Sequence, residues 1–257
     1  MKVALFQTSV NSTEDYITRV NRVIHKLESM GDCDLVVLPE LWASGAFLYE
    51  ESKRHAIRIT DELFAKLISV AEKKHFFLHA GSFAVLEENN EITNKSVLIS
   101  PSEGILKTYS KMHLFGFDTG ERRVFSQGRS VETESIGEFK LGLAICYDLR
   151  FPELFRELTK AGSNLLSIPA SWPLQRISHW KALLVARAIE NQSYVIGCNA
   201  VGTQNSIQLG GDSMVVDPYG NIICALGMEE EIKFCEIQID IAVALRETFP
   251  VLLDRII

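Results

Sequence analysis

Short apolar runs alternate along the chain with longer segments of mixed polarity. Many of the runs are apolar at nearly every position, which is typical of strands covered on both faces. Between them, apolar residues recur at helical spacing, as at Leu63, Leu67, Val70 and Ala71. The pattern predicts strands over residues 2–10, 34–40, 76–85, 95–100, 105–109, 141–146, 165–169, 194–200, 213–216, 221–225 and 232–239. It predicts helices that begin after Ser12 and Thr60 as N-caps, and helices over 152–161 and 180–191. We therefore expect a layered α/β protein with its helices outside.

Composition sets the broad class. No linker rich in Pro, Gly or Ser divides the 257 residues, so we expect one domain over residues 1–257. The net charge of −7 argues against binding to nucleic acid or to an anionic membrane, because both require a basic face. No apolar run approaches the ~18 residues of a membrane span. The first residues lack the long apolar stretch of a signal peptide, so we expect a cytoplasmic protein.

The cysteines and histidines give no metal or disulfide pattern. The cysteine count of five is odd, and no C-x-x-C pair occurs, which argues against a disulfide framework and a zinc ribbon. His75 and His79 have helical ligand spacing, but they stand in an expected strand without the glutamate of a zinc protease motif. We interpret them as structural and expect neither a metal nor an organic cofactor.

The segment 141–153 carries the strongest chemical signal. An apolar run ends on Cys146, and a proline six residues later can begin a helix. A thiol at a strand-to-helix turn is well placed to attack a substrate, and N–H groups of the turn can hold an oxyanion. The alternative is a buried, inert cysteine, because a reactive thiol needs partners that lower its pKa.

Two further residues could be those partners. Glu40 directly follows the apolar run 35–39, where partial desolvation would make a carboxylate a better base. Lys111 follows another expected strand, and an ammonium group there would favour the thiolate and stabilise an oxyanion. Taken alone, each could be an ordinary surface residue. Strand ends converge at one edge of an α/β sheet, so the thiol, the carboxylate and the ammonium group could meet there. Together these three groups can carry out acyl transfer through a thioester.

Two other interpretations stay open at this point. The first is a papain-like Cys–His enzyme in which His113 or His179 is the base. The second is a non-catalytic binding protein on the same scaffold. Near the cysteine, Arg150, Asp148 and Glu153 could form a structural ion-pair cluster. The predicted helix over 180–191 could hold Trp180 in the core and pair Arg187 with Glu190.

Three motifs resemble the signatures of the nitrilase, or carbon–nitrogen hydrolase, superfamily. They are Leu-Pro-Glu ending at Glu40, Lys-Met-His-Leu-Phe from Lys111, and Cys-Tyr-Asp-Leu-Arg-Phe-Pro-Glu from Cys146. They occur in the family's order, and the resemblance continues to Gly-Asp-Ser-Met-Val-Val-Asp-Pro-Tyr-Gly, which ends at residue 220. The resemblance implies a four-layer α-β-β-α sandwich that forms a homodimer or a larger assembly.

The same resemblance implies roles for individual residues. Glu40 would be the general base, Lys111 would stabilise the tetrahedral intermediate, and Cys146 would be the nucleophile. The backbone N–H of Tyr147 would share the oxyanion. Glu121 matches a second glutamate that family members often carry; its alternative is a surface residue paired with a neighbouring arginine.

The resemblance also suggests a substrate. Nitrilases usually have Cys-Trp-Glu at the nucleophile, whereas the Cys-Tyr-Asp here resembles amidases and carbamoylases. The segment from Pro169 is similar to ω-amidases, which act on amides of 2-oxo acids such as 2-oxoglutaramate. Phe115 and Trp172 could wall a pocket for a small-molecule amide, and Arg176 could bind its carboxylate. An N-carbamoyl amino acid or amine amidohydrolase remains the alternative.

Overall fold

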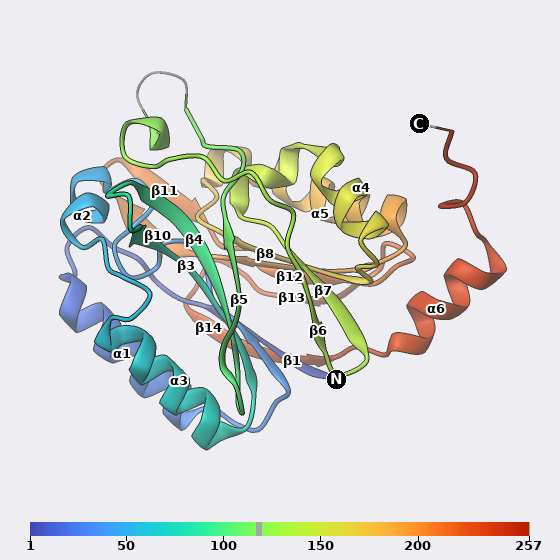
Figure 1. Cartoon of the computed structure of the whole chain (residues 1–257), viewed down its shortest axis with the longest axis horizontal. Helices are drawn as coiled ribbons and strands as arrows, with labels where there is room; N and C mark the ends of the chain where they lie inside the picture. Colours follow the sequence, from blue (N-terminus) through green and yellow to red (C-terminus); the bar gives the residue numbers. More distant parts are fainter. Residues whose placement is uncertain (117–119, 257) are drawn as a thin grey trace.

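Two six-stranded sheets pack against each other in the computed structural model, which describes residues 1–116 and 120–256 (Figure 1). The first sheet has the order β14-β1-β2-β3-β4-β5. Neighbouring strands are parallel from β1 to β3 and antiparallel elsewhere. Its strands are β1 (Lys2–Gln7), β2 (Leu35–Val37), β3 (Phe77–Leu86), β4 (Ile92–Ser100), β5 (Gly104–Ser110) and β14 (Glu231–Glu236).

The second sheet repeats this plan with the order β13-β12-β9-β8-β7-β6. Its central strands β7, β8 and β9 are parallel, and the outer pairs are antiparallel. Its strands are β6 (Thr133–Ile136), β7 (Phe139–Leu143), β8 (Leu165–Ala170), β9 (Tyr194–Asn199), β12 (Met214–Val216) and β13 (Ile222–Ala225). A separate hairpin joins β10 (Val201–Gln204) to β11 (Ile207–Gly210).

Helices cover the outer face of each sheet (Figure 1). The helices α1 (Tyr16–Ser29) and α3 (Glu62–Lys74) pack on the first sheet, and α4 (Pro152–Lys160) and α5 (Ile177–Asn191) pack on the second. A short helix, α2 (Tyr49–Arg54), lies near the end of β3, and α6 (Ile239–Thr248) extends to one side of the sheets. This is the expected four-layer α-β-β-α sandwich.

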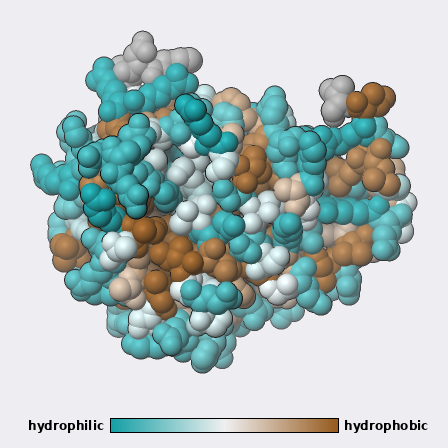
Figure 2. All heavy atoms as spheres, in the orientation of Figure 1, coloured by the Kyte–Doolittle hydropathy of each residue, from teal (hydrophilic) through white to brown (hydrophobic). Residues whose placement is uncertain are grey.

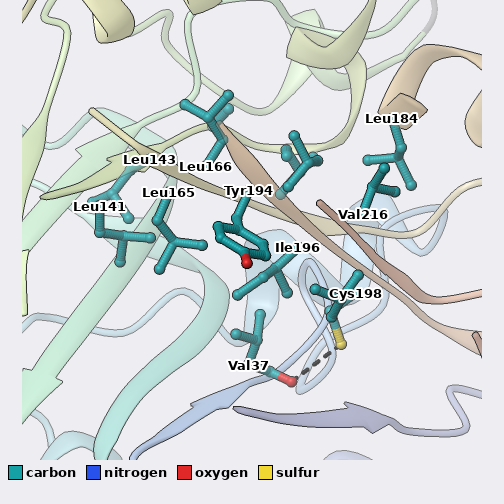
Figure 3. Packing of buried hydrophobic residues seen from close by; sticks show 14 of the residues in the cluster. Val37, Leu141, Leu143, Leu165, Leu166, Leu184, Tyr194, Ile196, Cys198 and Val216 are labelled. Atoms are coloured by element: carbon teal, nitrogen blue, oxygen red, sulfur yellow. Dashed lines mark hydrogen bonds between the residues drawn. The ribbon is translucent and has the colours of Figure 1, made fainter. Parts of the chain in front are cut away.

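Successive side chains of a strand point to opposite faces of its sheet, so each strand contributes to two layers of the core. In β1, Val3 and Leu5 belong to the core between the sheets, while Ala4 and Phe6 pack toward α1 and α3. Figure 3 shows the middle of the inter-sheet core, where the Cys198 thiol of the second sheet donates to a backbone carbonyl of β2 at 3.1 Å. Strands with both faces buried explain the continuous apolar runs of the sequence.

His79 links the two sheets within this core. Its Nδ1 lies 2.7 Å from Ser167 Oγ of β8, and its Nε2 contacts Ser96 Oγ of β4. Burial lowers the pKa of His79 to about 3, so the ring is neutral. His75 ends α3 in a left-handed conformation. Both histidines are structural, as expected.

Several predicted boundaries were wrong. Asp15, not Ser12, caps α1, because its carboxylate accepts the N–H of Thr18 at 3.0 Å while Ser12 joins the β10 segment. Asp61, not Thr60, caps α3 in the same way. The run 232–239 contains the end of β14 and the start of α6, a helix that the pattern did not predict.

In the part of the chain that the structure describes, no helix is long and apolar enough to cross a membrane.

Candidate active site

Cys146 lies at a sharp turn between β7 and the 3-10 helix η2 (Cys146–Arg150). Its φ of +45° is in the left-handed region, which a non-glycine residue keeps only where its surroundings hold it. The buried carboxylate of Asp148 braces this turn: Oδ2 accepts the N–H of Ile145 at 2.9 Å and the hydroxyl of Tyr109 at 2.8 Å. Its Oδ1 accepts the N–H of His113 at 2.9 Å. The turn is thereby fastened to the segment that follows β5.

The side chain of Glu40, which follows the end of β2, reaches the cavity that holds Cys146. Its side chain is buried, and Oε1 accepts hydrogen bonds from Lys111 Nζ at 2.7 Å and Asn94 Nδ2 at 2.9 Å. Its Oε2 accepts the N–H of Ser171 at 3.0 Å. The thiol of Cys146 lines the same cavity as this carboxylate. The carboxylate is therefore held against the ammonium group in the cavity that contains the thiol.

Lys111 follows β5 and lies between two carboxylates. Besides Glu40, its Nζ donates to Oε2 of Glu121 at 2.8 Å and to Oε1 at 2.9 Å. Glu121 begins the short 3-10 helix η1 (Glu121–Arg123) and also accepts the N–H of Phe115 at 2.6 Å. Asn94 of β4 bridges the two acids, since its Nδ2 donates to Glu121 at 3.1 Å as well. Two buried carboxylates thus share one ammonium and one amide.

Burial sets the protonation of these groups. It raises the pKa of the Cys146 thiol well above its ordinary range, Glu40 raises it further, and Lys111 opposes both only in part. Lys111 therefore favours the thiolate, as predicted, but burial and Glu40 outweigh it and the pKa of the thiol stays well above its ordinary range. Burial alone would lower the pKa of Lys111, but Glu121 and Glu40 outweigh it and hold that pKa well above its ordinary range.

A cavity opens onto the thiol. Phe115, Trp172 and Arg176 all line it, as predicted. The ring of Phe115 meets that of Tyr147 edge to face, with centroids 5.3 Å apart. Tyr147 is the second residue of η2, so its N–H lies in the first turn, where amides have no acceptor within the helix. Tyr49 also lines the cavity, and burial raises its pKa to about 12.

A match to a known protein family identifies the class of protein to which this site belongs. The sequence profile of the family described as carbon–nitrogen hydrolase matches residues 2–247. The chain belongs to the carbon–nitrogen hydrolase family. It is an enzyme, a carbon–nitrogen hydrolase, and a Glu-Lys-Cys triad is characteristic of its family. The interpretation as a non-catalytic binding protein is therefore wrong.

Individual relatives agree with this assignment. The hydrolase is 42% identical to a 2-oxoglutaramate amidase of Paenarthrobacter nicotinovorans over 99% of its own length and 89% of the relative. It is 31% identical to omega-amidase NIT2 of Mus musculus, over 99% and 94% of the two chains. A CN-hydrolase superfamily protein from Xanthomonas campestris, solved with an arsenic adduct in its active site, has a TM-score of 0.90. That structure is 29% identical and covers 99% of this chain and 97% of its own.

The surroundings of the hydrolase's cysteine correct two expectations. No histidine lines the cavity among the described residues. His113 instead lies beside Asp148 and stacks on Phe151, with ring centroids 3.8 Å apart, so it is not the base of a Cys–His enzyme. The expected ion-pair cluster is also wrong. Asp148 bonds the residues around it, Glu153 is exposed, and Arg150 lines the cavity.

Other expectations about the hydrolase are confirmed. Arg187 pairs with Glu190 at 2.7 Å, and Trp180 is fully buried. Glu121 is buried against the lysine and is not a surface residue.

Sequence reasoning missed four residues of the site. They are Asn94, which bridges the acids; Asp148, which braces the turn; and Tyr49 and Arg150, which line the cavity. A signal was present for two of them. Asp148 and Arg150 stand inside the cysteine motif itself, where spacing within a single turn of helix brings side chains toward the same site. Asn94 and Tyr49 stand in unremarkable polar stretches.

Proposed function

We propose that this hydrolase releases ammonia from the ω-amide of a 2-oxo acid, such as 2-oxoglutaramate, through a thioester on Cys146. One observation carries the proposal: the thiol, the Glu40 carboxylate and the Lys111 ammonium meet in a small cavity that Arg176 also lines. The first three groups suit attack on an amide carbonyl, and the fourth suits a substrate carboxylate.

Acylation follows from the groups that line the cavity with the thiol. As the Cys146 sulfur attacks the amide carbon, its proton passes to the Glu40 carboxylate, so the high pKa of the thiol is overcome only when substrate is present. The carbonyl oxygen becomes an oxyanion held by Lys111 and the N–H of Tyr147. When the intermediate collapses, the C–N bond breaks and Glu40 returns the proton to the nitrogen. Ammonia leaves and the thioester remains.

Deacylation uses the same groups again. Water attacks the thioester carbon and gives a proton to Glu40, and the new oxyanion again lies against Lys111 and Tyr147. Collapse breaks the C–S bond, Glu40 returns the proton to sulfur, and the carboxylic acid product forms. Glu121 does not exchange protons in this scheme. It holds Lys111 in place and keeps that side chain charged.

The substrate assignment has two supports. Relatives at 42% and 31% identity bear the names 2-oxoglutaramate amidase and omega-amidase. Arg176 lies with its Cζ 5.7 Å from the centroid of the Phe115 ring, at the cavity wall. A guanidinium there could bind the distal carboxylate in bidentate fashion and so orient the amide toward the thiol.

Ammonia release tests the assignment. The panel contains 2-oxoglutaramate, succinamate, the neutral amide butyramide and an N-carbamoyl amino acid. The wild type should have its higher kcat/KM on the ω-amides that carry a carboxylate, and Arg176→Ala should reduce the preference for succinamate over butyramide. A wild type that prefers butyramide or the N-carbamoyl compound would overturn the substrate class.

We further propose that the protein acts in the cytoplasm, as a homodimer of one domain per chain. Exposed apolar side chains on α6 and the segment after it support association: Val243, Phe249 and Leu253 are 44%, 62% and 83% exposed. Figure 2 shows apolar surface at this end of the chain, in the upper right of the view. Such residues favour burial against a partner. Light scattering at micromolar concentration should give the mass of a dimer, and a monomer would contradict the proposal.

A further inference from the structure

Two cysteines that the proposed mechanism does not use lie on neighbouring strands at one edge of the sandwich. Cys224 is in β13, the outermost strand of the second sheet, and Cys235 is in β14, the outermost strand of the first. Residues 226–230 join the two strands. Cα atoms of β13 and β14 come within 8 Å of each other, and Figure 1 shows the two strands on the same side of the molecule. The chain therefore brings two thiols from different sheets to one edge.

The strand register turns both thiols toward the space between the sheets. Cys224 pairs with Val215 of β12, and Cys235 pairs with Val3 of β1. Directly paired residues of neighbouring strands have their side chains on the same face of the sheet. Val3, Val215 and Cys224 all belong to the core between the sheets. Cys235 packs against that core with part of its surface exposed. The two thiols therefore approach each other from opposite sheets.

A lysine side chain crosses the same edge. Lys233 stands two residues before Cys235 in β14, so the two side chains lie on the same face of the strand. The Nζ of Lys233 donates to the backbone carbonyl of Ala225, the residue after Cys224, at 2.9 Å. An ammonium group of the first sheet thus lies beside the segment that holds Cys224. A positive charge there favours the thiolate, which is the reactive form of a cysteine.

The two thiols change each other's ionisation in opposite directions. Cys235 lowers the pKa of the Cys224 thiol, burial opposes this, and Lys233 lowers that pKa again. Cys224 raises the pKa of Cys235, and burial raises it further. By contrast, burial raises the pKa of Cys33 to about 11. An acidic thiol beside a protonated one is typical of redox-active dithiols, in which one sulfur reacts first and the other closes the disulfide.

We propose that Cys224 and Cys235 form a reversible disulfide when the protein is exposed to hydrogen peroxide, and that this bond ties the two sheets together at their shared edge. The Cys224 thiol gives up its proton and its sulfur attacks a peroxide oxygen. The O–O bond breaks, which leaves a sulfenic acid and one water. The Cys235 thiol then attacks the sulfenic sulfur, and its proton leaves with the hydroxyl group as a second water. Peroxide is reduced, and the two sulfurs are oxidised.

The pair is separate from the active site. In the described part of the chain, no residue of β13 or β14 lines the cavity at Cys146, so the inference does not depend on the proposed substrate. Disulfides of cytoplasmic proteins are usually transient or redox-sensing, which agrees with a bond that a thiol reductant reverses.

The disulfide should also stabilise the folded protein. The strand β13 pairs with β12 and β14 pairs with β1, so the bond would join strands of different sheets. A crosslink that closes a short loop removes freedom from the unfolded chain. For a chain of this size, the melting temperature should rise by roughly 5–10 °C.

Stepwise oxidation tests the proposed bond. Reduced protein would be treated with hydrogen peroxide, its remaining thiols alkylated, and its peptides mapped without reductant. The wild type should yield one peptide pair joined through Cys224 and Cys235, lighter by two hydrogen atoms, and dithiothreitol should separate it. Cys33→Ala is the matched control, because Cys33 is also buried and does not line the cavity. This variant should still form the bond.

The melting temperature would then be compared between the oxidised and reduced forms of each variant. It should rise on oxidation in the wild type and in Cys33→Ala, and stay unchanged in Cys224→Ala and Cys235→Ala. Comparison within one variant removes any loss of stability that the substitution itself causes. Cys235 is partly exposed, so its alanine variant should fold even if the variant at the buried Cys224 does not.

Three results would overturn the inference. The first is oxidised wild type in which both thiols are still free or carry only added oxygen. The second is a disulfide between either residue and another cysteine. The third is a Cys224–Cys235 bond that lowers the melting temperature, which would mean that the folded strands do not bring the two thiols together.

Discussion

Replacing Lys111 by methionine probes the charge network most sharply. Methionine has a similar length but no charge. The ammonium lies 2.7 Å from Glu40 and 2.8 Å from Glu121, and all three side chains are at most 4% exposed. In the variant, two buried carboxylates would share only the amide of Asn94, which already donates to both. The substitution therefore removes the oxyanion donor and also leaves uncompensated buried charge.

The two losses have separate typical magnitudes. One oxyanion donor is typically worth ~10²–10³-fold in kcat. Breaking a buried ion pair by removing one partner costs about 3–5 kcal/mol of unfolding free energy. The double variant Lys111→Met with Glu121→Gln removes one of the stranded carboxylates. It should recover much of the stability but not the rate, because glutamine cannot supply the missing cation.

The stability loss should depend on pH in a defined direction. Burial raises the pKa of the Glu121 carboxyl, and Lys111 opposes that rise, so the pKa climbs further when the lysine is lost. A carboxyl whose pKa is higher in the folded state favours the folded state when it is protonated, and this contribution disappears as pH rises through the folded pKa. The deficit of Lys111→Met relative to the wild type should therefore shrink as the pH falls through the raised pKa of Glu121.

Urea unfolding and ammonia release would measure both losses. Three results would refute the reasoning at different steps. A near-native kcat in Lys111→Met would remove the lysine from the oxyanion site. An unchanged unfolding free energy would show that the carboxylates do not need the cation. Recovery of turnover in the double variant would mean that the lysine serves only to neutralise Glu121.

Three other predictions concern the base, the core and cofactors. Glu40→Gln should lower kcat by ~10²–10⁴-fold while the protein stays folded, since it removes general-base catalysis; a near-native kcat would contradict this role. His79 is neutral and fully buried, with a pKa near 3 against an ordinary 6.5. Its contribution to stability should therefore be lost as pH falls from 6.5 toward 3, at about 1.4 kcal/mol per pH unit. Urea unfolding should show a shallower acid dependence in His79→Gln, and an unchanged dependence would exclude this residue. Dialysis against EDTA should leave ammonia release unchanged, whereas loss of activity that zinc restores would contradict a metal-free mechanism.

The sequence predicted the parts of the site that local pattern determines. Glu40, Lys111 and Cys146 each follow an apolar run, and the fold brings the ends of those strands together. The cysteine differs in one respect from the prediction, because β7 ends at Leu143 and the thiol stands on the following turn. The resemblance to a family added the pairing of the two sheets, which short-range periodicity does not encode.

The missed residues depend on tertiary contacts. Asn94 lies within β4 between polar neighbours, and its role arises only because two distant acids meet its amide. Arg150 has acidic neighbours in sequence, but Asp148 turns toward Tyr109 and His113, so the guanidinium is left for the cavity. The high pKa of the thiol was also missed, because the effect of burial and of a nearby carboxylate on a thiol is visible only in three dimensions.

The central claim is that catalysis passes through a thioester on Cys146. Intact-protein mass spectrometry of enzyme quenched during turnover of a slow amide, such as succinamate, tests this claim directly. The wild type should gain the mass of one acyl group, located at Cys146 by peptide mapping, and Cys146→Ala should be folded, inactive and free of adduct. Turnover by Cys146→Ala, or an acyl group on another residue of the wild type, would contradict the mechanism.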